Sequence, residues 1–415
     1  MANLARSIRL TSGKGDFIKR KMPSGRTVDI CLLEWNVDLT NGCIAQVTPQ
    51  HLDEVVKNNG LYLPGNFNVY KKEGTADNRC DYCYAWQKNS GSVIPFVVDE
   101  KTRADFEEFK PKFLRFGKNT EPGHPYYFDA FSKLIELCTE FKTTPIITTK
   151  MLPFGIEGAE ETMKYADTGS DAFFKLAREK NIPSGKDLAA RLKEANTSLL
   201  MSLGYDRLEQ GPLMQGCSNE WRIQQALKYY TSGVNANLTV VCDVTDSIEN
   251  NVSRSSFIGR ALEVRKETGI PVRIIPARSY THKVTEFITG IKKKVLTNAG
   301  YYQTPQLDAL DDGKPTIQSR YVKKGAFKLV PNYIHPDFKG LFVEGMGACG
   351  VAAETEHCDK CNCMGKTRIS FPESELPKIE FTTPTRRKMF MARARQRRFA
   401  NTPLLPNFEM PKKSK

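Results

Sequence analysis

Two cysteines three residues apart, Cys80 and Cys83, form the stretch of the chain best suited to chemistry. They lie in the segment Arg79–Ala85, which reads RCDYCYA, so that Tyr82 stands between them. Two thiolates at this spacing can hold one metal centre from a single turn of backbone. By itself the pair is a weak signal, and it gains weight only from the elements that surround it.

Four further cysteines lie within fifteen residues near the C-terminal end of the chain. Several glycines and His357 lie beside them, and a glycine-rich loop with four sulfur atoms is typical of a metal site. Tetrahedral sulfur coordination suits both zinc and an iron–sulfur cluster, and the spacing does not separate the two. We therefore predict either a structural zinc site or an auxiliary iron–sulfur cluster, held by Cys349, Cys358, Cys361 and Cys363.

Length and composition restrict the class of protein. The chain of 415 residues is 40% hydrophobic and 10% aromatic, which is enough for a packed core and argues against global disorder. It has no run of about 18 apolar residues, and residues 1–14 have no apolar core of the signal-peptide type. We therefore expect no membrane span and a cytoplasmic location, where thiols stay reduced. The scattered cysteines are interpreted as small buried residues: Cys31, Cys43, Cys138, Cys217 and Cys242.

Strands and helices alternate along residues 61–276, which predicts an α/β fold with parallel strands. The strands are nearly continuous apolar runs, which favours a sheet covered on both faces. No reversal of strand order is visible, so we predict a partial (β/α)6 parallel barrel, with an open doubly wound sheet as the alternative. The expected strands are 61–70, 112–117, 145–150, 198–205, 238–245 and 271–276, preceded by one at 28–35. The expected helices are 127–141, 170–180, 186–195, 219–232 and 256–267, preceded by a short one at 49–59.

The predicted organisation has four parts. An N-terminal extension covers residues 1–60, and the barrel covers residues 61–285. A cysteine-rich C-terminal region of residues 286–382 follows, and a basic tail of residues 383–415 ends the chain. The tail has ten Lys or Arg residues and one acid, so it supplies +9 of the net charge of +14. The body of the protein is therefore only modestly basic.

The basic residues of the tail are interleaved with methionine and phenylalanine. Such a run can grip a phosphate backbone and stack on bases, which predicts contact with DNA or RNA. A solvated tail without a partner and docking to an acidic partner are the alternatives. The residues concerned are Arg386, Arg387, Lys388, Arg393, Arg395, Arg397 and Arg398.

Polar residues recur at or just past the ends of the predicted strands. In parallel β/α folds these carboxyl ends meet at one edge, where ligands bind. Each residue alone has a structural explanation, such as a helix cap for Thr120 or a solvated strand end for Lys150. Their coincidence on one edge favours a ligand site made of Thr120, Glu121, Lys150, Ser202, Cys217, Asp243 and Arg278.

This ordered set resembles the radical S-adenosylmethionine superfamily over about half of the chain, and most closely its spore photoproduct lyase-like branch. In that family a loop after the first strand carries C-x3-C-x2-C, and the segment from Cys80 to Ala85 looks like the second half of this motif. The segment Gly117–Pro122 is similar to the end of the family's second strand. Thr149-Lys150 resembles its third-strand element, and Ser202 resembles its fourth.

The resemblance implies a [4Fe–4S] cluster on Cys80 and Cys83, S-adenosylmethionine as cofactor and an external electron donor. It also implies roles for strand-end residues: Tyr82, Thr120, Lys150 and Ser202 would bind S-adenosylmethionine. Cys217 would return a hydrogen atom to a substrate radical. The branch hints at a nucleic-acid or nucleotide substrate without fixing one.

The sequence departs from the family pattern at Ala76, where the first cysteine of the motif is expected. Asp77, Cys43 or one of the four C-terminal cysteines could supply the missing ligand, and soft sulfur is the ligand that iron–sulfur clusters favour. Two alternative functions stay open: a non-enzymatic nucleic-acid-binding protein on a degenerate barrel, with a structural zinc site, and a structural or assembly protein.

Overall fold

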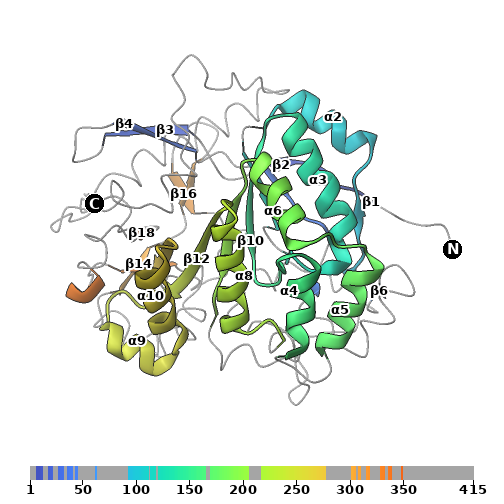
Figure 1. Ribbon diagram of the computed structural model, residues 1–415. Coiled ribbons are helices and arrows are strands. Elements are labelled where there is room, and N and C mark those ends of the chain that lie inside the picture. Colours follow the sequence, from blue (N-terminus) through green and yellow to red (C-terminus); the bar gives the residue numbers. More distant parts are fainter. Residues whose placement is uncertain are drawn as a thin grey trace.

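A computed structural model gives the structure of the chain, and Figure 1 shows its elements. The predicted helix at 49–59 lies outside the described residues. The structure describes residues 6–12, 17–21, 27–31, 35–40, 43–44, 61–62, 92–111, 113–117, 120–164, 169–204, 216–276, 301–304, 307–309, 315–317, 328–331, 335–338 and 347–348.

An eight-stranded sheet forms the centre of the molecule, in the order β18-β13-β12-β11-β10-β9-β5-β2. Neighbouring strands from β5 to β18 pair in parallel, and β2 at the edge runs antiparallel to β5. The spatial order from β5 to β18 repeats the chain order, so the described strands show no reversal of the kind found in a doubly wound fold. The predicted α/β class with a parallel sheet is confirmed. The strands are β2 (Thr11–Ser12), β5 (Trp35–Val37), β9 (Phe113–Phe116), β10 (Thr144–Thr149), β11 (Ser198–Ser202), β12 (Asn235–Cys242), β13 (Val272–Pro276) and β18 (Gly347–Ala348).

The first parallel strand differs from the prediction. The sequence predicts that the strand at 61–70 lies next to β9 in the sheet. In the structure β5 is the strand that pairs with β9 on that side. Within that range the structure has β6 (Leu61–Tyr62), which pairs antiparallel with β7 (Ser92–Val93) outside the main sheet. The sequence of β5, WNV, is three residues long and has a polar centre, so it lacks the pattern of a strand. Part of the predicted N-terminal extension therefore belongs to the main sheet.

The longer helices agree with the predicted ones because their apolar residues recur with helical spacing. Three others were missed. The helix α2 begins at a capping box on Asp99, α4 is glycine-containing, and α9 is only seven residues long. The helices are α2 (Glu100–Phe109), α3 (Phe128–Glu140), α4 (Gly155–Glu161), α5 (Gly169–Glu179), α6 (Gly185–Glu194), α8 (Asn219–Thr231), α9 (Ile248–Arg254) and α10 (Phe257–Thr268).

The helices that connect the strands cover one face of the sheet. Right-handed crossovers that always advance in the same direction place their helices on the same side. Figure 1 shows α3, α6, α8 and α10 side by side along the sheet. Contacts join α3 to β10, α8 to β12 and α10 to β13. We call the opposite side the inner face.

The two faces of β12 differ in chemistry, although residues on both faces are buried, Leu238 on one and Asn237 on the other. Alternate residues of a strand point to opposite faces. The apolar residues that join the helix-side clusters are Ala236, Leu238, Val240 and Cys242. The intervening residues toward the inner face are Asn235, Asn237, Thr239 and Val241. The strand begins three residues earlier than predicted, and those three residues, Asn235–Asn237, contain both asparagines.

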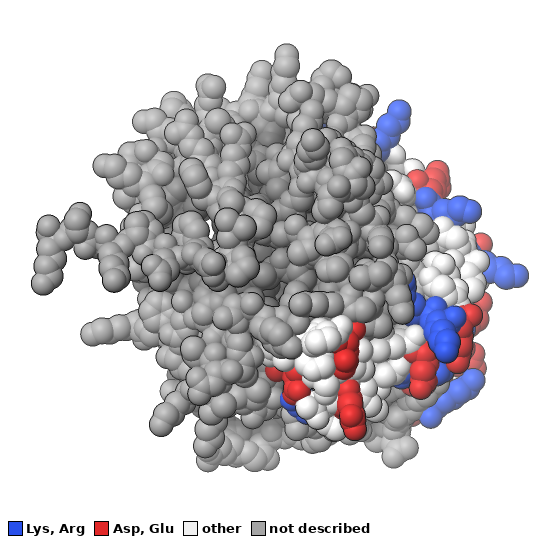
Figure 2. Space-filling view, turned by 90° about the vertical axis from the view of Figure 1, so that its left-hand side faces the viewer, with Lys and Arg blue, Asp and Glu red and all other residues white. Residues whose placement is uncertain are grey.

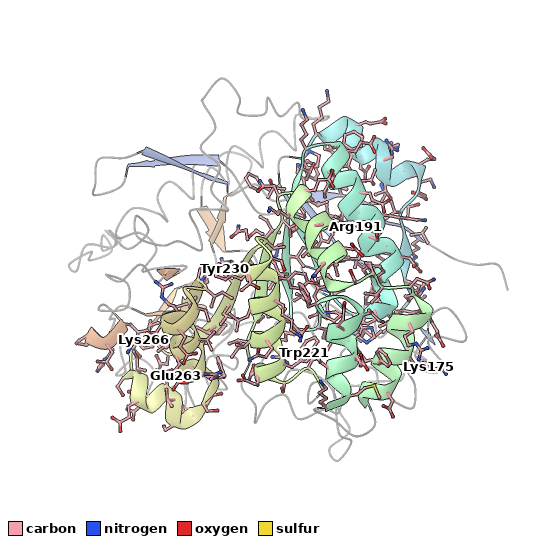
Figure 3. The ribbon with its side chains drawn as sticks, viewed as in Figure 1. Lys175, Arg191, Trp221, Tyr230, Glu263 and Lys266 are labelled. Atoms are coloured by element: carbon pink, nitrogen blue, oxygen red, sulfur yellow. The ribbon has the colours of Figure 1, made fainter. Side chains whose placement is uncertain are left out.

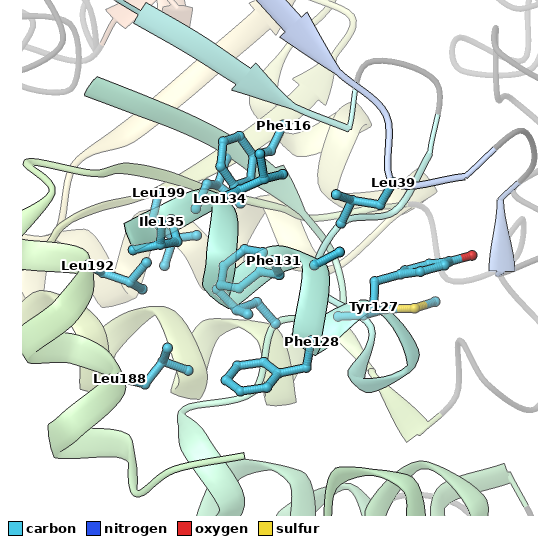
Figure 4. Close-up of a cluster of buried hydrophobic side chains, with 14 of the residues drawn as sticks. Leu39, Phe116, Tyr127, Phe128, Phe131, Leu134, Ile135, Leu188, Leu192 and Leu199 are labelled. Carbon is cyan, nitrogen blue, oxygen red and sulfur yellow. The ribbon is translucent and has the colours of Figure 1, made fainter. Parts of the chain in front are cut away.

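The main hydrophobic core lies between the sheet and the helices (Figure 4). Phe116 of β9 meets Phe131 of α3 edge to face, with ring centroids 5.8 Å apart. Leu134 and Leu199 are fully buried in the same cluster. Truncating a side chain such as Phe131 to alanine would cost about 3–5 kcal/mol of stability. This core fixes the ends of β9 and β10, which carry the candidate site.

Trp221 of α8 ties the central helices together (Figure 3). Its side chain is fully buried, and its indole N–H donates to the carbonyl of Gly158 in α4 at 3.1 Å. The ring also meets Phe173 of α5 edge to face at 6.3 Å. A buried indole needs such a partner for its N–H, so α8 and α4 hold a defined relative position.

Smaller sheets lie around the main one. In the part of the surface that Figure 2 describes, acidic and basic side chains are interspersed. Among the described residues, no helix is long and apolar enough to cross a membrane. The smaller sheets pair β1 (Arg6–Ser7) with β8 (Phe96–Val97), β3 (Phe17–Lys21) with β4 (Thr27–Cys31), β14 (Tyr301–Thr304) with β17 (Lys328–Pro331), and β15 (Leu307–Ala309) with β16 (Pro315–Ile317).

Candidate functional site

The carboxyl ends of the parallel strands meet at one edge of the sheet and bring polar residues together. At β5 this edge begins with Asp38 and Thr40, and Thr40 is fully buried. Cys43 follows six residues after the end of β5 and is half-buried. Its sulfur is a reduced thiol. Burial raises the pKa of Tyr127 well above its ordinary value, and the nearby Cys43 raises it further.

The loop after β9 turns back tightly over Gly117. Gly117 has φ of +69°, a left-handed conformation that glycine adopts without strain. A Cβ there would lie 2.6 Å from both Pro122 Cδ and the carbonyl oxygen of Thr120. Its N–H donates to the carbonyl of Val37 at 2.9 Å, which joins the loop to the end of β5. Thr120 is thereby held at the edge, where its hydroxyl lies 3.3 Å from Asp38 Oδ1.

Glu121 braces the loop after β9 against the end of β10. Its buried carboxylate accepts from the N–H of Gly123 at 2.8 Å, the N–H of Lys150 at 2.8 Å and the hydroxyl of Thr149. Burial raises the pKa of Glu121, while these three hydrogen bonds and the charge of Lys150 act in the opposite direction. The carboxylate is occupied by the protein itself, so its role at this edge is to hold the backbone of the loop.

His124 stabilises the same loop from a buried position. It is fully buried, and its Nδ1 accepts from the N–H of Tyr126 at 3.1 Å, which caps a short 3-10 helix. Its Nε2 is buried without a hydrogen-bond partner. Because Nδ1 accepts, the proton of the neutral ring lies on Nε2. Burial lowers the pKa of His124 to about 3, so the ring stays neutral at ordinary pH.

Lys150 and Ser202 lie at the ends of β10 and β11. Lys150 is half-buried, one residue past the end of β10. Ser202 is the last residue of β11, and its carbonyl lies 3.4 Å from a guanidinium nitrogen of Arg222. Arg222 also donates to Asn219 Oδ1 at 3.2 Å, and both of these residues belong to α8. The side-chain amide of Asn219 pairs with both backbone groups of Gly204, which fixes the chain just after β11.

Side chains just after β12 hold the end of this strand in place. Asp243 is fully buried, and its Oδ1 accepts from the N–H and the hydroxyl of Thr245 at 3.1 and 2.7 Å. The amide of Asn251 pairs with the backbone of Asp243 at 3.0 and 2.9 Å. Arg254 forms an ion pair with Asp246 at 2.9 Å. These hydrogen bonds stabilise the turn after β12, so Asp243 has a structural role at this edge.

The structure brings together three of the sequence-predicted ligand residues, Thr120, Lys150 and Ser202, at the carboxyl edge of neighbouring strands. Cys217 is 1% exposed and packs in the main hydrophobic core just before α8. The remaining predicted site residues lie outside the described ranges: Tyr82, Cys80, Cys83, Arg278, the four C-terminal cysteines and the basic residues of the tail. Among the described residues, no group of three or more potential ligands is arranged to hold a metal ion.

The sequence offered Cys43 as one candidate for the missing ligand, but it did not place Cys43 at this edge, because the first strand was predicted at 61–70. Sequence reasoning also missed His124, whose burial no local pattern indicates. No family model matches the chain, and no curated protein sequence matches it.

Proposed function

We propose that the chain is a radical S-adenosylmethionine enzyme in which Cys43, Cys80 and Cys83 supply three thiolates to a [4Fe–4S] cluster. The observation that carries this proposal is the position of Cys43 just after β5, the first parallel strand of the sheet. The first cluster cysteine of the family is expected after its first strand. Cys43 and Cys80 would then be separated by 36 residues in place of the three residues of the family motif, and Ala76 would not be a ligand position.

The residues at the edge fit such a cluster in their chemistry. Iron–sulfur clusters favour thiolate ligands, and the half-buried thiol of Cys43 lies at the edge of the sheet where ligands of parallel folds bind. The one-directional strand order supports a partial barrel. A cytoplasmic location, where thiols stay reduced, suits the same chemistry.

The edge residues then take roles in binding S-adenosylmethionine. The ammonium group of Lys150 would pair with the carboxylate of the methionine part, because it is the cation at the end of β10. The hydroxyls of Thr120 and Ser202 would bind its polar groups. Glu121 would keep Thr120 and Lys150 at a fixed separation through its bonds to the loop after β9 and to the N–H of Lys150.

When bound, a reduced cluster supplies one electron that cleaves S-adenosylmethionine to methionine and a 5′-deoxyadenosyl radical. The protein holds the cofactor in one orientation and excludes water from it. In this scheme Cys217 would be a hydrogen-atom donor only if its buried thiol became accessible to substrate. The four C-terminal cysteines would hold zinc or an auxiliary cluster, and an external protein would deliver the electron.

The experiment is anaerobic reconstitution of the full chain with iron and sulfide, followed by reduction in the presence of S-adenosylmethionine. We expect broad absorbance near about 400 nm from thiolate-to-iron charge transfer and formation of 5′-deoxyadenosine. A Cys80→Ala variant should lose the product. An intact cluster that yields no 5′-deoxyadenosine would overturn the enzyme proposal and favour the nucleic-acid-binding alternative, and a colourless zinc protein would do the same.

A further inference from the structure

Tyr127, which directly precedes α3, contributes its ring to the main hydrophobic core and leaves its hydroxyl unpaired. The residue is 1% exposed. Figure 4 shows its hydroxyl directed away from Phe131, another member of the same cluster. Among the described residues, this hydroxyl has no hydrogen-bond partner. A buried polar group without a partner costs stability and is rare in native proteins, so the hydroxyl calls for an explanation beyond packing.

The surroundings of this hydroxyl belong to the carboxyl edge of the sheet. Cys43 packs against the hydrophobic cluster that contains Tyr127. Cys43, Thr40 and Glu121 all act on the pKa of Tyr127, so these three side chains lie near its phenol. Cys43 and Thr40 follow β5, and Glu121 belongs to the loop after β9. The phenol therefore lies next to the edge that carries the candidate site.

Of these three neighbours, Cys43 is the acceptor that remains for the hydroxyl proton. The phenol keeps this proton at ordinary pH, because the pKa of tyrosine is about 10 and burial raises it. The carboxylate of Glu121 already accepts three hydrogen bonds from the loop and from β10. Thr40 lowers the pKa of Tyr127, which is the effect of a donor and not of an acceptor.

We infer that the hydroxyl of Tyr127 donates a hydrogen bond to the sulfur of Cys43 when Cys43 is a cluster ligand. Tyr127 is then a positioning residue, which orients the thiolate and raises the reduction potential of the cluster. The potential rises because a hydrogen bond to a ligand sulfur stabilises the more negative, reduced form. The inference deepens the proposed function and rests on it for the presence of the cluster. A residue that only filled the core could be phenylalanine.

The test is a redox titration of the reconstituted full chain, followed by electron paramagnetic resonance, for the wild type and Tyr127→Phe. The signal that is absent from Cys43→Ala identifies the cluster at the edge and separates it from any cluster on the C-terminal cysteines. For that signal, Tyr127→Phe should lower the ratio of reduced to oxidised cluster about three- to tenfold at a fixed potential. A tenfold change corresponds to about 59 mV for a one-electron couple. The melting temperature of the metal-free variant should stay the same or rise, because the substitution removes an unpaired buried hydroxyl.

Tyr229→Phe is the matched control. Tyr229 is also fully buried, but its hydroxyl donates to the carbonyl of Pro153 at 2.6 Å. This variant should have a lower melting temperature, because it loses that hydrogen bond, and an unchanged reduction potential.

The two proposals fail in different ways. An unchanged potential in Tyr127→Phe, or an equal shift in Tyr229→Phe, overturns the inference while the cluster itself stays intact. A wild-type chain that binds no cluster at the edge overturns the proposed function, and the inference with it.

Discussion

Replacing His124 with asparagine should remove a measurable part of the pH dependence of this protein's stability. His124 is fully buried in the loop that carries Thr120 and Glu121, and burial lowers its pKa from 6.5 to about 3. The unfolded chain takes up a proton as the pH falls below about 6.5, whereas the folded chain does not. Stability from this residue is therefore complete above about pH 6.5 and is lost as the pH falls toward 3.

The size of the effect follows from the shift in the pKa of His124. One pKa unit corresponds to about 1.4 kcal/mol. Linkage then gives a loss of about 2 kcal/mol between about pH 7 and pH 5, and up to about 5 kcal/mol below the folded pKa. Asparagine keeps an oxygen to accept the N–H of Tyr126, which His124 Nδ1 accepts at 3.1 Å, and it does not titrate. The smaller side chain adds a packing cost that does not vary with pH.

Urea denaturation of the wild type and of His124→Asn, near pH 7 and near pH 5, measures this effect. The loss of unfolding free energy on acidification should be about 2 kcal/mol greater for the wild type than for the variant. Glu121 acts with the opposite sign, because its raised pKa lets the folded state take up a proton first, but it is present in both proteins and cancels. Equal losses in the two proteins would refute the assignment of His124 as a buried neutral ring.

Three further changes test the site and the tail. Glu121→Gln should lower the free energy of unfolding by about 1–3 kcal/mol in urea titrations, because an amide cannot accept from Gly123, Thr149 and Lys150 together. An unchanged free energy of unfolding would contradict the bracing role of Glu121. Gly117→Ala should cost at least about 1 kcal/mol in the same assay, because φ is +69°. Deleting residues 384–415 should abolish salt-sensitive retention on DNA or RNA columns, and unchanged retention would exclude the tail as the binding element.

The central strands could be predicted because their signals are local. Short strands with apolar centres mark β10, β11 and β13, and the helices between them have apolar residues at helical spacing. β5 could not be predicted in the same way, because three residues with asparagine at the centre carry no strand pattern. Its place in the sheet is set by pairing with β9, a partner more than seventy residues away.

The candidate site could be predicted only where it follows a recognisable strand. The rule that ligands bind past the carboxyl ends of parallel strands identified Thr120, Lys150 and Ser202. The same rule misses Cys43 when the first strand is misassigned. The start of β12 at Asn235 depends on its pairing with β11, which no local sequence pattern indicates. Periodicity alone predicts a mostly apolar strand at residues 238–245, and this predicted strand excludes Asn235 and Asn237.

Cys43 as a cluster ligand is the central claim, and one comparison tests it most directly. Cys43→Ala and Cys138→Ala would be reconstituted in parallel and assayed for 5′-deoxyadenosine after reduction with S-adenosylmethionine. Cys138 is the matched control because it is buried on α3 in the main core, away from the edge. We predict that Cys138→Ala forms the product as the wild type does and that Cys43→Ala forms none. Product formation by Cys43→Ala at the wild-type level would contradict the account.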